Sequence, residues 1–207
     1  MRCVFILLFV AISFAPAVII DQIAVVIGNS IVKDSDIDRD IRVTSFLNNE
    51  PLNFDNAARK QAANRLIDQI FIRREIQVGD YPTATLKEAD EQLDRLKKER
   101  FRSNLAFQQA LNRFGLTELE LRTDFQWQLT VLRFIEIRFK PAVLVSDEEV
   151  EKYYKQNAAK YPGKSLDDVR EQIRDTLTEE RINQQFFRWL EYQRRSNKIQ
   201  YLEPSLA

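Results

Sequence analysis

The chain has 207 residues, with 31 basic and 31 acidic side chains and no histidine. Its zero net charge argues against a dedicated nucleic-acid binder, because such a protein needs a basic face to displace counterions from phosphates. The lack of histidine excludes Ser/His/Asp and Cys/His nucleophilic sites and most zinc or copper sites. Four glycines beside 14 phenylalanines favour long helices over a barrel or sandwich of short strands, since few glycines allow few tight turns.

The first residues have the layout of a secretory signal peptide. A basic start precedes an apolar run at 3–14, and small residues follow at 15–17. We expect cleavage after Ala17, which predicts a periplasmic protein and removes the only cysteine. The alternative is a signal that stays uncleaved, because residues 3–20 are just long enough to span a bilayer as a tilted helix. Membrane contact is expected only in that case.

The remainder, residues 18–207, is long enough for one well-buried domain and does not require two. Residues 23–32 read IAVVIGNSIV, in which two β-branched runs flank Gly28-Asn29, and this pattern predicts a β-hairpin. The tail KIQYL at 198–202 alternates like a short strand and is a candidate to pair with that hairpin. The predicted fold class is therefore mostly α, with a small N-terminal hairpin joined by a short C-terminal strand.

Everything between the hairpin and the tail follows helical periods. Capping boxes, in which a Ser or Thr and a Glu three residues later satisfy each other's free backbone N–H groups, mark starts at Thr85, Thr117 and Ser146. Apolar residues spaced by three or four predict the core, with Val78, Leu86 and Leu132 among them. The predicted helices cover about 34–48, 55–78, 86 onward, 103–114, 117–140, 146–160 and 166–196.

An acidic run, DSDIDRD at 34–40, superficially resembles a calcium-binding loop. The EF-hand pattern then requires glycine at its sixth place and glutamate at its twelfth, where this chain has Arg39 and Ser45. We therefore interpret the run as the cap and first turn of a helix, where negative charge is favourable. No metal site, cofactor site or catalytic residue is predicted.

Six segments, taken in order, resemble the chaperone part of SurA and its relatives, which include the parvulin-type foldases. The resemblance covers nearly the whole chain after the signal and rests on helical signatures rather than a catalytic fingerprint. The segments are DQIAVVIGNSIVKDSDIDR, NRLIDQIFIRREI, LKEADEQLDRLKK, FQQALNRFGLTELELRTDFQWQLTVLRFI, VSDEEVEKYYKQN and LDDVREQIRDTLTEERINQQFFRWLEYQRRSNKIQYL.

One departure from the family bears on function. Members with an isomerase carry a parvulin domain between the YYKQN-type helix and the final long helix, where this chain has only residues 158–165. Parvulin sites also normally use histidines, and this chain has none. The resemblance therefore implies no prolyl isomerase activity, with the turn at 161–164 as the place where the isomerase would be inserted. It implies one chaperone domain, whose helical part at 21–160 is completed by residues 165–203.

The resemblance also implies an ATP-independent periplasmic chaperone for unfolded or extended clients, such as outer-membrane β-barrel precursors. Aromatic residues that lie off the predicted core stripes are candidates for a partly exposed client-binding crevice, although each could equally be core. The alternative function is a non-enzymatic helical scaffold or assembly factor that binds a folded envelope partner; the oligomeric state is left open. The candidate client-binding residues are Phe101, Trp127, Phe134, Tyr153, Tyr154 and Phe187.

Overall fold

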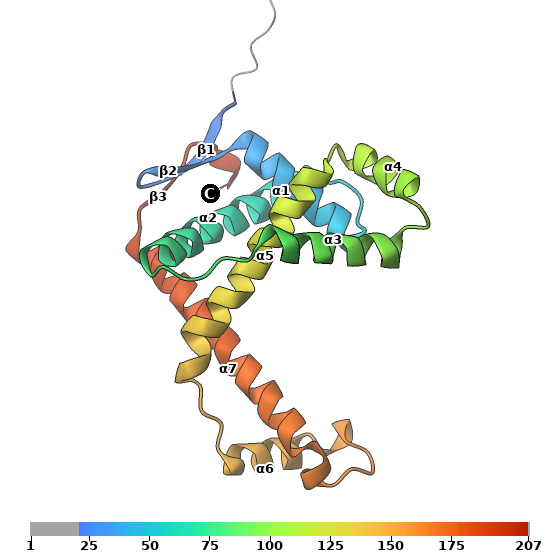
Figure 1. Cartoon of the computed structure of the whole chain (residues 1–207). Coiled ribbons are helices and arrows are strands. Elements are labelled where there is room, and N and C mark those ends of the chain that lie inside the picture. The colour runs from blue at the N-terminus through green and yellow to red at the C-terminus, as the bar shows by residue number, and fades with distance from the viewer. Residues whose placement is uncertain (1–20, 207) are drawn as a thin grey trace, which may run out of the picture.

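The computed structural model describes residues 21–206, so the signal peptide predicted at 1–17 lies outside the described residues. Figure 1 shows a body built from the sheet and α1–α5, from which the N-terminal half of α7 projects with α6 at its far end. The elements are β1 (Ile23–Ile27), β2 (Ser30–Lys33), α1 (Asp34–Asn48), α2 (Asn56–Val78), α3 (Leu86–Arg100), α4 (Asn104–Phe114), α5 (Glu118–Phe139), α6 (Asp147–Gln156), α7 (Leu166–Ser196) and β3 (Ile199–Tyr201). Three short 3₁₀ turns, η1 (Lys140–Ala142), η2 (Ala158–Lys160) and η3 (Pro204–Leu206), complete them.

The sheet joins the two ends of the described chain. Its order is β2-β1-β3, and both neighbours pair antiparallel with β1. Gly28 turns the hairpin at φ +57, a backbone conformation that glycine adopts at low cost. The predicted pairing of the tail with the hairpin is confirmed, with Val25 opposite Tyr201 and Ile27 opposite Ile199. The mostly α fold with a small three-stranded sheet is likewise as predicted.

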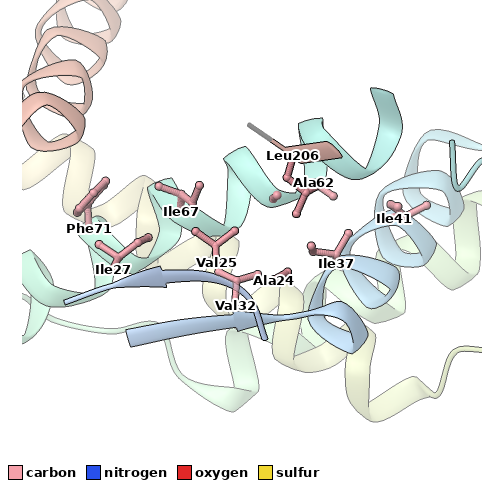
Figure 2. Close-up of a cluster of buried hydrophobic side chains, with 11 residues drawn as sticks. Ala24, Val25, Ile27, Val32, Ile37, Ile41, Ala62, Ile67, Phe71 and Leu206 are labelled. Atoms are coloured by element: carbon pink, nitrogen blue, oxygen red, sulfur yellow. The ribbon is translucent and has the colours of Figure 1, made fainter. Parts of the chain in front are cut away.

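The sheet packs its inner face on α1 and α2 (Figure 2). Val25 and Ile27 of β1 point toward Ile67 and Phe71 of α2, and all four side chains are buried. Leu206 from the last 3₁₀ turn closes the same cluster. Burial of these side chains, at about 25 cal/mol per Å² of apolar surface, holds the C-terminal segment against the N-terminal one.

Polar contacts reinforce this closure at Arg59, a largely buried residue of α2. Its guanidinium donates to Glu203 at 2.8 Å and forms ion pairs with two carboxylates of the acidic run 34–40. Asp36 of that run accepts a bond from the backbone N–H of Lys33 at 3.2 Å, as expected for a carboxylate at a helix N-terminus. The run therefore caps α1 and ties it to α2.

The predicted helix starts are confirmed where capping boxes mark them. The hydroxyl of Thr117 accepts from the N–H of Glu120, whose carboxylate accepts from the N–H of Thr117 at 2.7 Å. Equivalent boxes open α3 and α6. One boundary is wrong: α6 ends at Gln156 rather than near residue 160, because the chain tightens into the 3₁₀ turn η2.

The inner face of α5 differs from the predicted stripe. Phe134, expected to be partly exposed, is 0% exposed and packs edge-on against Tyr81 and Phe139. Thr130 fixes the same face, because its hydroxyl accepts from the backbone N–H of Ala84 at 2.9 Å. Residues two positions apart in a helix point in directions about 200° apart around its axis. Burial of Phe134 therefore turns Leu132 outward, and Leu132 is 63% exposed.

Two other predicted core positions are also wrong. Val78, the last residue of α2, is 86% exposed, and Leu86, the first residue of α3, is 56% exposed. Both lie at helix ends beyond the packed side of the body, where the periodicity continues but no neighbouring element covers the side chain. Within residues 21–206, no helix is both long and apolar enough to cross a membrane.

Candidate functional site

A trough follows the length of α5 on the side that faces α1 and α7. It consists of three neighbouring hollows that share lining residues: the first two share Asp40 and Asp124, and the second and third share Leu132. The central hollow, about 460 Å³, lies between α1, α2, α5 and α7. Apolar side chains along the trough are Val43, Leu47, Leu66, Ile72, Leu119, Trp127, Val131, Leu132, Ile135, Ile182, Phe186, Phe187 and Leu190.

The trough is long enough for an extended peptide. Its α5 wall runs from Leu119 to Lys140 through the three hollows where α5 and the turn that follows it meet the other helices. From Leu119 to Glu136 alone, at about 1.5 Å per helical residue, the wall is about 25 Å long. An extended chain advances about 3.3 Å per residue. The wall therefore matches about seven residues of extended polypeptide.

Large apolar side chains in the centre of the trough remain available to a ligand. Leu132 and Phe187 are 63% and 61% exposed, and they line the same hollow from α5 and α7. Trp127 is half-buried beside them, with the guanidinium of Arg73 3.7 Å from its ring centroid. This cation–π contact fixes the indole, and a fixed apolar anchor loses less side-chain entropy when it binds.

Two carboxyl groups, those of Asp40 and Asp124, lie among these apolar residues. Asp40 accepts hydrogen bonds from Arg65, yet burial raises its pKa because removal from water disfavours the charged form. Burial, with a smaller contribution from the charge of Asp40, raises the pKa of Asp124 to about 6 despite the opposing hydrogen bond from Gln128. The trough thus contains a carboxyl group that changes charge near neutral pH.

The charged groups at the α2 and α7 side of the central hollow are neutralised by one another. Asp68, which also lines this hollow, accepts from Arg194 of α7 at 2.7 Å. Arg194 donates further to the side chain and carbonyl of Asn64 at 3.0 and 2.8 Å. These bonds join α2 to α7 and hold two walls of the trough in place.

Two of the six aromatic residues predicted for client binding, Trp127 and Phe187, lie in the trough. Phe101 lines a separate cavity between α3 and α4. Phe134 lies in the core, where Trp189 and its other aromatic neighbours enclose it. The structure therefore does not bring the six residues together into one crevice.

Tyr153 and Tyr154 belong to a small cluster between α6 and α7, far along the projecting helix (Figure 1). The hydroxyl of Tyr154 donates to the carbonyl of Lys164 at 2.6 Å, and its ring stacks on Tyr161 with centroids 6.0 Å apart. Lys160 donates to the hydroxyl of Tyr153 at 3.3 Å. These contacts hold the turn that joins α6 to α7.

Sequence periodicity missed Leu132, Val131 and Phe186 as trough residues. The second half of α5 carries apolar residues at 131, 132, 134, 135, 137 and 139, which is more than one stripe can contain. Such an excess predicts a second apolar face, although it does not indicate which face is buried. Phe186, expected as core, is 8% exposed and forms part of the floor.

Within residues 21–206, no group of three or more Asp, Glu, Cys or His side chains is arranged to hold a metal ion. Comparison with protein-family models finds no match to this chain, and comparison with curated protein sequences finds none either. The resemblance to SurA and the division into a signal peptide and one domain therefore stay predictions.

Proposed function

We propose that this protein is a periplasmic, ATP-independent chaperone that holds extended segments of unfolded envelope proteins, such as outer-membrane β-barrel precursors, in the trough along α5. The row of three adjoining hollows along α5 is the observation that carries the proposal. It offers an extended chain about 25 Å of wall, with exposed Leu132 and Phe187 near its middle.

The polar groups of the trough suit a client of variable sequence. Gln69, Gln128 and Thr44 line the central hollow and offer both donors and acceptors to a peptide backbone, which every client carries. The apolar residues would take client side chains without requiring a fixed sequence. Such a surface discriminates unfolded from folded proteins, because only an unfolded chain presents backbone and apolar side chains together.

The expected affinity is weak. Three or four apolar anchors at about 2 kcal/mol each provide roughly 6 to 8 kcal/mol before the cost of association. This corresponds to micromolar binding at best. Weak binding at several points lets clients leave without an energy source, which an ATP-independent chaperone requires.

The test is aggregation of a denatured outer-membrane barrel protein, followed by light scattering, in the presence of residues 18–207. We expect suppression at a few-fold molar excess, and a roughly tenfold higher half-maximal concentration for Leu132→Asp or Phe187→Asp, because each places a charge where a client side chain is buried. Leu105→Asp is the control: Leu105 is 69% exposed on α4, outside the trough, and should leave suppression unchanged.

Two results would count against the proposal. The first is no suppression by the unchanged protein at several-fold excess. The second is the same half-maximal concentration for Leu132→Asp, Phe187→Asp and the control Leu105→Asp. A tight, stoichiometric complex with one folded envelope protein, together with no binding of denatured proteins, would favour the scaffold alternative.

A further inference from the structure

A second cavity, of about 580 Å³, lies outside the trough, and residues from the end of α1, from α3 and from α4 line it. Its apolar side is aromatic. Phe46 is stacked with Phe101 at 6.1 Å between ring centroids and meets Phe114 edge-on at 5.5 Å. Phe101 and Phe114 are only partly buried, so their rings can receive another apolar group. An aromatic side chain fits such a surface by offset or edge-on contact.

The rim of this cavity is charged. Arg100 and Arg113 line it, together with one carboxylate, Glu50. Arg100 donates to the carbonyl of Phe46 at 3.3 Å, which holds its guanidinium at the cavity. Arg113 is exposed and makes no hydrogen bond or ion pair with any residue between 21 and 206. Its five donors are therefore available to a ligand.

We infer that this cavity binds the free C-terminus of a polypeptide that ends in an aromatic residue. A terminal residue carries a carboxylate and a ring on the same Cα, so one residue can place the ring against Phe101 and Phe114 while the carboxylate reaches Arg113. An internal aromatic residue offers a neutral amide at that position. Arginine is suited to this role because its planar guanidinium matches a carboxylate with two parallel hydrogen bonds.

The cavity would give clients a second point of contact besides the trough. Its role in selecting clients rests on the proposed function, whereas its binding of a chain end does not. The apolar trough would hold the body of an extended chain. The cavity would hold the end of the same chain when that end is an aromatic residue.

The test is fluorescence anisotropy with labelled peptides of about ten residues. Two of the peptides end in Phe, one with a free carboxylate (the Phe acid) and one with an amide. The third peptide ends in Ala with a free carboxylate. We expect the Phe acid to bind roughly tenfold more tightly than either control, since an ionised hydrogen-bonding partner is about twice as strong as a neutral one. Equal affinity for the acid and the amide would overturn the inference.

Three variants complete the experiment. Arg113→Gln should abolish the preference for the acid, whereas Arg102→Gln, which removes an exposed arginine that does not line the cavity, should keep it. Glu50→Gln should tighten binding of the acid several-fold, a gain that misfolding cannot produce. Persistence of the preference in Arg113→Gln would contradict the assignment.

Failure of this site is distinguishable from failure of the trough. Leu132→Asp should keep the preference for the acid, and Arg113→Gln should keep suppression of aggregation for a client whose last residue is not aromatic. A protein that prefers the Phe acid but suppresses no aggregation would refute the proposed function and retain the chain-end site. The reverse result would refute the chain-end site alone.

Discussion

Replacement of Asp124 by Asn should stabilise the protein above pH 6 and change little below pH 4. Burial raises the pKa of Asp124 from its ordinary 3.8 to about 6, so the folded state disfavours the charged carboxylate. A pKa difference of one unit corresponds to about 1.4 kcal/mol, so full ionisation of Asp124 costs the folded protein up to about 3 kcal/mol. Asn keeps an acceptor for the 2.6 Å bond from Gln128 and carries no charge. We expect a gain of about 2 kcal/mol at pH 7.5.

The sign follows from linkage. Because the folded-state pKa lies above the unfolded one, the contribution of Asp124 to stability is fully present below about pH 4 and is lost as the pH rises through about 6. Denaturant unfolding of both proteins between pH 4 and 8 measures the difference. Asp94→Asn, at an exposed position of α3, should change the free energy of unfolding by less than about 0.5 kcal/mol. A difference for Asp124→Asn that is independent of pH would refute the reasoning.

Two further predictions concern stability. Phe134→Ala should lower the free energy of unfolding by about 3 to 5 kcal/mol, measured by denaturant titration, because it leaves a cavity among Tyr81, Phe139 and other core rings; a loss below about 1 kcal/mol would contradict the placement of this ring. Arg59→Ala should destabilise the protein at pH 7, and this loss should shrink as the pH falls through and below 4.5. The reason is that Arg59 lowers the pKa of Glu203 from its ordinary 4.5, so the part of the stabilisation that comes from this pair exists only while that carboxylate is charged; a loss that stays constant from pH 7 to pH 3 would contradict it.

Local signals explain why the element boundaries could be predicted. Ser or Thr followed three residues later by Glu satisfies free backbone N–H groups at a helix start wherever it occurs, so α3, α5 and α6 begin where the sequence places them. Gly115 ends α4 at φ +63, which is a local property as well. The β3 strand was predictable because KIQYL alternates and the hairpin left an edge strand unpaired.

The trough could not be predicted in the same way, because its walls come from four helices that are distant in sequence. The choice between Leu132 and Phe134 as the buried residue depends on how Tyr81, Phe139 and Trp189 pack around α5, and periodicity contains no information on those neighbours. The same holds for the raised pKa of Asp124, which results mainly from burial among neighbouring helices and in smaller part from Asp40 of α1 in the same hollow. Sequence alone indicated only that α5 has more apolar residues than one buried face can take.

Site-specific photo-crosslinking tests the central claim, that unfolded clients occupy the trough, most directly. A photoreactive residue would replace Leu132 or Phe187 in the trough, or Leu105 or Leu202 as exposed apolar controls elsewhere. The account predicts crosslinks to a denatured barrel protein from the two trough positions, none from the two controls, and none from any position once the client has folded. Equal crosslinking from all four positions, or crosslinking from the controls alone, would contradict it.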